Sequence, residues 1–175
     1  VGLYAKSNGV FGIVTKVAHY CLKLPKHWGF HAYYWPREEI QPVTKAMRDA
    51  TALEMFDVHL NDRWRWIMEG EPIPDDCFFT LTFAVNADNE TELKGKEQSI
   101  HDLCRANGGR YFPGFAEYFH IKWPTALVAG YPRKPLPTPP PGVRSYTYNL
   151  EEFIYPVSKF PVVYDKIEEH LKKYG

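Results

Sequence analysis

The sequence has no excess of charge of either sign. Its 21 lysine and arginine residues are balanced by 21 aspartate and glutamate residues, and no segment is a block of basic residues. Binding to nucleic acid depends on an excess of positive charge that neutralises phosphates. We therefore expect no nucleic-acid partner.

Long hydrophobic runs and a targeting leader are also missing from these residues. A helix that spans a bilayer needs about 20 consecutive, mostly apolar residues, and a secretory leader places a basic segment before an apolar one. We therefore expect no transmembrane segment. A cytoplasmic location is favoured, and peripheral contact with a membrane stays open as an alternative.

Cysteine is scarce, and the histidines show no ligand pattern. Cys21, Cys77 and Cys104 are odd in number and widely spaced, which argues against a disulfide framework or a zinc site and favours buried thiols. His27 and His31 are four residues apart, but in a predicted strand or turn this spacing does not place both rings on one helical face. No metal site is predicted.

Apolar and aromatic residues, in contrast, are plentiful. Apolar residues make up 45% of the 175 positions and aromatic residues 16%, which suits one globular domain with a sizeable core. The aromatic side chains could line a pocket for a flat substrate or fill the core of a thin two-layer domain. We favour core packing for Trp28, Trp64, Phe79 and Phe83.

The pattern of strands and helices predicts an α+β fold. Its clearest part is the alternation over 77–85, where Cys77, Phe79, Leu81, Phe83 and Val85 fall on one face of a strand. The predicted elements, in chain order, are a strand over 28–35, a helix over 38–50, a strand over 53–60, a short helix over 63–68 capped by Asn61 or Asp62, the strand from 77, a helix capped by Asp88 or Asn89 and ended by 107–109, a short strand over 110–112, a proline-rich connection over 132–141, a strand over 146–155 and a final helix after Ser158. Two β-α-β units of this kind predict a ferredoxin-like two-layer domain, with an antiparallel sheet and helices packed on one face.

Two segments near the ends of the chain resemble a known family. Ser7–Thr15, with Gly9, Gly12 and the run Ile13-Val14-Thr15, resembles the Gly-x-x-Gly-Ile-Val-Thr segment that ends the FAD-binding domain of FAD-linked oxidases of the vanillyl-alcohol-oxidase, D-lactate-dehydrogenase and glycolate-oxidase type. Phe153–Pro161 resembles the strand, Pro-x-Ser turn and helix late in the cap domain of the same enzymes. The resemblance implies that residues 1–24 are the end of an FAD-binding domain and residues 25–175 a cap, or substrate, domain truncated at its C-terminus.

The resemblance also implies a cofactor and a reaction. The family binds FAD and oxidises a hydroxy acid, an alcohol or a phenol by hydride transfer to the flavin. Backbone groups of Gly12, Ile13 and Val14 would border the FAD, because a glycine lets a ligand approach the backbone closely. The family's glycine-rich pyrophosphate loop is missing from these residues. We therefore expect the missing upstream FAD-binding domain as a partner, and we expect this polypeptide alone not to retain FAD.

Three residues are candidates for the substrate side of the sheet. His59, Tyr33 and Trp35 are predicted to share the sheet face that covers the flavin and the small-molecule substrate, whereas His101 and His170 are predicted to be solvated helix positions.

An unpaired edge of the strand over 9–15 would favour a homodimer. An alternative from another functional class is a free-standing ferredoxin-like binding or assembly module without redox activity.

Overall fold

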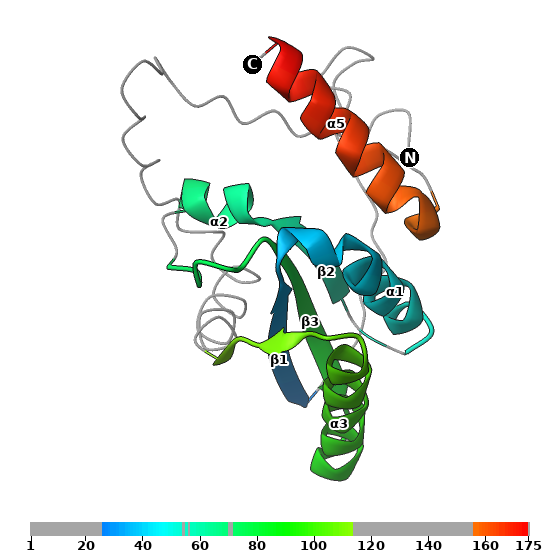
Figure 1. Ribbon diagram of the computed structural model, residues 1–175. Coiled ribbons are helices and arrows are strands. Elements are labelled where there is room, and N and C mark those ends of the chain that lie inside the picture. The colour runs from blue at the N-terminus through cyan, green and yellow to red at the C-terminus, as the bar shows by residue number, and fades with distance from the viewer. Residues whose placement is uncertain (1–25, 54, 56, 70–71, 114–155, 175) are drawn as a thin grey trace, which may run out of the picture.

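A four-stranded antiparallel sheet forms the centre of the protein (Figure 1). The computed structural model describes residues 26–53, 55, 57–69, 72–113 and 156–174. The strands are β1 (His27–Trp35), β2 (Asp57–Asp62), β3 (Phe79–Ala87) and β4 (Arg110–Tyr111), in the order β2-β3-β1-β4. The helices are α1 (Ile40–Ala50), α2 (Arg63–Glu69), α3 (Glu90–Ala106) and α5 (Phe160–Tyr174), and the 3-10 turns η1 (Arg37–Glu39) and η2 (Val157–Lys159) precede α1 and α5.

This arrangement confirms the predicted ferredoxin-like fold. The central strands β1 and β3 are antiparallel partners along their whole length, from His27 opposite Ala87 to Trp35 opposite Phe79. The chain runs β1-α1-β2 and then β3-α3-β4, so each helix connects two strands that are separated by one other strand in the sheet. This is the split β-α-β plan.

The two long helices begin and end where local chemistry favours it. The Asn89 side chain caps α3 by accepting a hydrogen bond from the Glu92 backbone N–H at 2.9 Å. Gly108 follows the end of α3 with a φ of +78°, a left-handed conformation that glycine adopts without strain. Helix α1 buries Ile40, Val43 and further residues at helical spacing.

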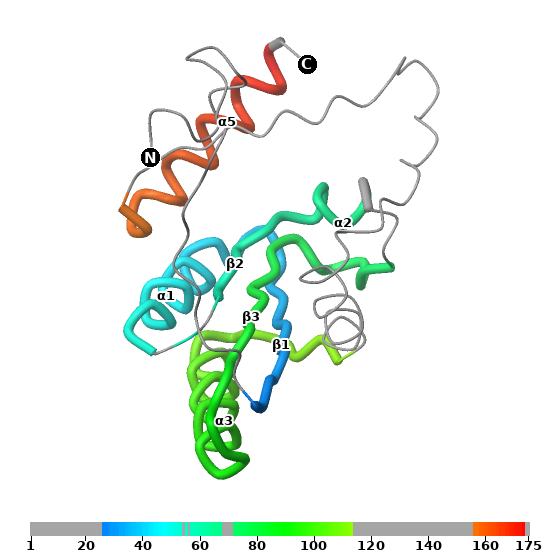
Figure 2. Tube along the Cα trace, turned by 180° about the vertical axis from the view of Figure 1, so that it is seen from behind, coloured from blue at the N-terminus to red at the C-terminus, as the bar shows by residue number. Residues whose placement is uncertain are grey.

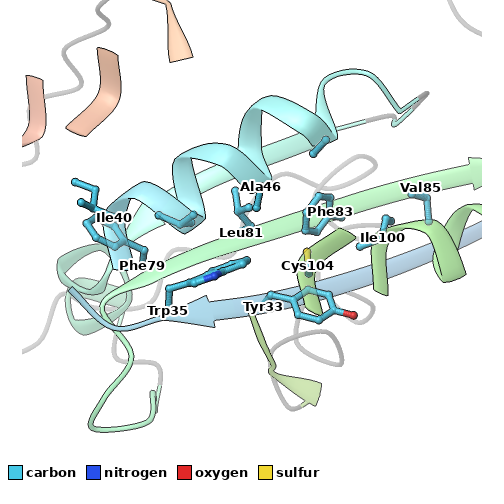
Figure 3. Close-up of a cluster of buried hydrophobic side chains, with 12 residues drawn as sticks. Tyr33, Trp35, Ile40, Ala46, Phe79, Leu81, Phe83, Val85, Ile100 and Cys104 are labelled. Atoms are coloured by element: carbon cyan, nitrogen blue, oxygen red, sulfur yellow. The ribbon is translucent and has the colours of Figure 1, made fainter. Parts of the chain in front are cut away.

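The main core lies between the sheet and these two helices. Figure 3 shows Trp35 of β1 beside Leu81 of β3, and Ile100 of α3 beside Val85 of β3. All four side chains, and that of Tyr33 of β1, are fully buried. Burying a large apolar side chain stabilises a fold by about 1.5–3 kcal/mol, so this cluster supplies much of the domain's stability. Cys77 and Cys104 are buried free thiols, as predicted, while Cys21 lies outside the described residues.

Helix α2 covers part of the opposite face of the sheet. Asp62 caps it, since its Oδ1 accepts hydrogen bonds from the backbone N–H groups of Trp64 and Arg65 at 3.1 and 3.3 Å. Trp66 is buried and donates from Nε1 to Thr80 Oγ1 at 2.8 Å. Trp64 lies two residues earlier, on the other side of the helix, and is 56% exposed. The prediction of core packing was therefore wrong for Trp64, although it is confirmed for Phe79 and Phe83.

The N-terminal end of α5 contacts the main core, while its C-terminal end points away from the sheet (Figure 2). Phe160 and Tyr164 pack their rings against Phe79 at centroid distances of 5.8 and 5.2 Å. The predicted turn and helix after Pro156 are thus confirmed as η2 and α5. Further along the helix, Ile167 and Leu171 are exposed.

Some sequence predictions differ from the structure or lie outside the residues that it describes. Strand β2 begins at Asp57 rather than at residue 53, because the Leu53 backbone N–H still bonds to the Ala50 carbonyl and continues the turn that ends α1. The predictions for 132–141 and 146–155, and the predicted flavin-bordering residues Gly12, Ile13 and Val14, lie outside the described residues.

No helix within the described part of the chain has both the length and the apolar character needed to cross a membrane.

Candidate functional site

The sheet has two chemically different faces, which we call the helix face and the second face. Tyr33 and Trp35 point from β1 to the helix face, where α1 and α3 cover them. Successive side chains of a strand point to opposite faces, so Tyr34 and Ala32 point to the second face. Ala32 indeed packs with Trp66 of α2.

His59 lies on the second face. Its neighbours Val58 and Leu60 pack against the main core, so the side chain between them points the opposite way. The expectation that His59, Tyr33 and Trp35 share one face was therefore wrong. Tyr33 and Trp35 are fully buried, which leaves neither side chain any exposed surface for a substrate in this structure.

An accessible imidazole–carboxylate pair forms the chemical centre of the second face. His59 Nε2 lies 2.7 Å from Asp57 Oδ2, and the His59 side chain is 59% exposed. The two residues are two positions apart on β2 and so project from the same face. When Nε2–H donates to Asp57, Nδ1 becomes a hydrogen-bond acceptor, which is the arrangement that a general base requires.

Aromatic side chains of β1 line the same face. The rings of Trp28 and Phe30 stack at a centroid distance of 6.2 Å and an interplanar angle of 7°. Tyr34 lies further along, with the guanidinium of Arg110 5.9 Å from its ring centroid and the Phe112 ring edge-on at 6.0 Å. Burial, followed by the nearby carboxylate of Asp76, raises the pKa of Tyr34, so its hydroxyl stays protonated near neutral pH.

The structure places Tyr34, and not the adjacent Tyr33, on the same face as His59. The segment from Trp28 to Trp35 carries aromatic rings on both faces, so its periodicity does not reveal which face is covered by helices. The pairing of β1 with β3 decides it, because Tyr33 lies opposite Leu81 and Tyr34 opposite Thr80. In the sequence, the pattern that bears on which face of β1 is covered is the clear alternation of its partner strand β3.

The comparisons with known proteins add no family assignment. A scan against models of known protein families finds no match, and a search of the curated proteins finds none either.

Metal binding has no support within the described residues. No three histidine, cysteine, aspartate or glutamate side chains there converge in a way that could hold a metal ion. Arg63 and Arg65 belong to α2, on either side of Trp64. Among the described residues, the second face therefore offers an acid–base pair and aromatic side chains.

A second group of polar side chains lies on the helix face, where sequence reasoning expected none. His101 was predicted to be a solvated helix position, but it is half-buried and forms a hydrogen bond with the Tyr33 hydroxyl. Its ring also lies 5.0 Å from that of His31. No local pattern indicates this contact, because His101 is 68 residues from Tyr33 along the chain.

Proposed function

We propose that residues 25–175 are the substrate-covering cap of an FAD-dependent oxidoreductase that oxidises a hydroxy acid, an alcohol or a phenol. The observation that carries the proposal is the ferredoxin-like sheet, order β2-β3-β1-β4, lying between the two segments that resemble FAD-linked oxidases. Pro156, η2 and α5 also fall where the second of these segments has its turn and helix. Residues 1–24 would then end the flavin domain, and an upstream domain would supply the rest of it.

The second face is the side of the sheet that we assign to the substrate. The long helices α1 and α3 occupy the helix face, and α2 covers part of the second face through Trp66, so a flavin domain and its substrate would approach at the edge strand β2, where His59 is exposed. His59 and Asp57 are the accessible acid–base pair there. This assignment replaces Tyr33 and Trp35 with Tyr34 as the aromatic candidate.

The chemistry that these residues would perform is proton transfer. A bound flavin supplies the hydride acceptor. As the C–H bond of the substrate carbon breaks, the hydroxyl proton passes to Nδ1 of His59, and the C–O bond becomes a carbonyl. Asp57 orients the ring and stabilises the imidazolium that forms. General-base catalysis of this kind contributes about 10²–10⁴-fold to a rate.

The test is expression of the complete open reading frame that contains these residues. We expect a yellow protein with stoichiometric flavin and turnover with at least one of D-lactate, glycolate or a para-alkylphenol. His59→Gln should lower kcat about 100-fold or more, because it removes the proton acceptor. His170→Gln on α5 is the matched control and should leave kcat unchanged.

Two outcomes would contradict the proposal. One is a reading frame closed by stop codons on both sides of residues 1–175, and the other is a complete protein without flavin. Either result favours the alternative, a free-standing ferredoxin-like binding or assembly module, which the fold allows equally. A cytoplasmic location and a homodimer formed through the strand over 9–15 belong to the same proposal, and fractionation and size-exclusion chromatography would test them.

A further inference from the structure

Five polar and aromatic side chains meet between β1, α3 and β4, and we call them the histidine cluster. His31 and Tyr33 come from β1, Glu97 and His101 from α3, and Tyr111 from β4. His31 Nε2 lies 3.0 Å from Glu97 Oε1, and the Tyr33 hydroxyl bonds to His101 Nδ1. The Tyr111 ring packs edge-on against His101 at a centroid distance of 5.3 Å. The cluster thus joins the two elements α3 and β4 to the central strand.

The site of the His31–Glu97 pair is shaped for a carboxylate. Gly29 lies on the same face of β1 as His31, and a Cβ at Gly29 would collide with Glu97 Oε1. A Cβ there would also come within 3.0 Å of Val85 Cγ2. The missing side chain of Gly29 therefore admits the carboxylate next to the imidazole.

The pair is largely removed from water. The side chains of His31 and Glu97 are 10% and 26% exposed, and His31 Nδ1 is buried without a hydrogen-bond partner in the described structure. A proton on His31 would turn its contact with Glu97 into a charge-assisted bond. One positive charge in the cluster therefore has a partner.

A second proton has no such partner. The rings of His31 and His101 are 5.0 Å apart in an edge-on arrangement, so two imidazolium ions would repel each other in a partly buried site. Nδ1 of His101 faces the Tyr33 hydroxyl, and burial raises the pKa of that hydroxyl, so it stays protonated near neutral pH. In the neutral tautomer that carries its proton on Nε2, the hydroxyl donates to Nδ1. Protonated Nδ1 is itself a donor, so the hydroxyl would have to turn and act as an acceptor.

Other charged groups of α3 act on the cluster in both directions. Burial, then His31 and Arg105, lower the pKa of His101, while Glu97 and Asp102 raise it. The net direction is downward, so the folded state favours the neutral ring. Tyr111 and the Cys104 thiol face Tyr33 from β4 and α3, and both disfavour its ionisation. Figure 3 shows Tyr33 beside Cys104.

We propose that His31 and His101 form a one-proton latch. The latch holds α3 and β4 against β1 while the ring of His101 is neutral, and it releases them when that ring takes up a proton beside His31. The direction of the pH dependence follows from the linkage between proton binding and opening. His101 binds a proton more weakly in the closed state than in the open state. The closed state is therefore most stable above the ordinary histidine pKa of about 6.5, and its stability falls as the pH drops below that value. Release would free the β4 edge of β1 at mildly acidic pH.

Hydrogen exchange of the full chain between pH 7.5 and pH 5 tests the latch. The opening constant is obtained for amides of 97–111 after correction for the intrinsic exchange rate. Opening linked to the uptake of one proton becomes about tenfold more favourable per pH unit where the linkage is complete. We expect a rise on acidification in the wild type and a flat profile in His101→Gln. His59→Gln, which removes a histidine on the other face, should behave as the wild type.

The latch is wrong if the wild-type profile is flat or if His101→Gln keeps the pH dependence. Should His101→Gln fail to fold, an NMR titration of the wild-type histidines decides. The latch requires His101 to titrate below a free histidine and requires α3 protection to fall along with that titration. Titration at or above the free value would overturn it.

Discussion

The attachment of α5 to the sheet domain is predicted to depend on Arg37 in η1. Its Nη2 donates to Asp165 Oδ1 at 2.6 Å and to Glu168 Oε2 at 2.8 Å, and its Nε donates to Glu168 Oε1 at 3.3 Å. The guanidinium carbon also lies 5.1 Å from the ring centroid of Tyr164 and 5.7 Å from that of Phe79. One side chain of the sheet domain therefore joins two carboxylates and a ring of α5.

The size of the effect follows from the exposure of these groups. Arg37 is 31% exposed and Glu168 26%, whereas Asp165 is 63% exposed. The two-point bond to Glu168 is therefore worth about 1 kcal/mol, and the Asp165 pair a few tenths of that. Cation–π contact adds about 0.5–1 kcal/mol. Because methionine keeps the apolar stem, Arg37→Met should lower the free energy of unfolding by about 2 kcal/mol.

Urea unfolding of the full chain, together with hydrogen exchange of α5, measures this change. Arg48→Met on α1 is the matched control, because Arg48 is 58% exposed and pairs only with its neighbour Asp49 among the ion pairs of the described chain. It should change stability by less than about 0.5 kcal/mol. Arg37→Lys should fall between the two, since an ammonium cannot form the two-point bond. An Arg37→Met effect as small as that of the control would refute this account of α5.

Three further predictions concern packing and reactivity. Gly29→Ala should lower the free energy of unfolding by about 1–3 kcal/mol through overpacking, and with it the melting temperature. Gly95→Ala adds a Cβ with nothing within 4 Å and should instead stabilise the helix by about 0.5–1 kcal/mol. Equal effects of the two variants would show that the crowding at Gly29 is absent. Trp66→Phe should cost about 1 kcal/mol in urea unfolding, because it removes the bond to a buried hydroxyl; an unchanged midpoint would contradict that bond. Burial raises the pKa of the Cys77 thiol to about 12 and raises that of Cys104 as well, so peptide mapping should find both thiols unmodified by Ellman's reagent at pH 8 until the protein unfolds; rapid labelling of the folded chain would contradict their burial.

The parts of the fold that depend on local chemistry were predictable from the sequence. The alternation from Phe79 to Val85 identified β3, and Asn89 and Gly108 marked the two ends of α3. In each case the interaction that decides the structure lies within a few residues of the signal. The ferredoxin-like plan followed from the order of these helices and strands along the chain.

The site was less predictable, because pairing between distant strands decides it. The aromatic rings on both sides of β1 left its orientation open, and only the register with β3 assigns Tyr34 rather than Tyr33 to the second face with His59. The contact between His101 and Tyr33 likewise joins residues far apart in sequence. Ile100 and Cys104 lie on the buried face of α3, but helical spacing carries no information on which strand residue meets His101, the side chain next to Ile100.

Flavin content and turnover of the complete reading frame test the central claim most directly. The account predicts stoichiometric flavin that D-lactate, glycolate or a para-alkylphenol reduces, and a His59→Gln variant that keeps the flavin but turns over about 100-fold more slowly. A complete protein that purifies without flavin would contradict the assignment as an oxidoreductase cap. Normal turnover in His59→Gln with flavin bound would instead contradict only the assignment of His59 as the base.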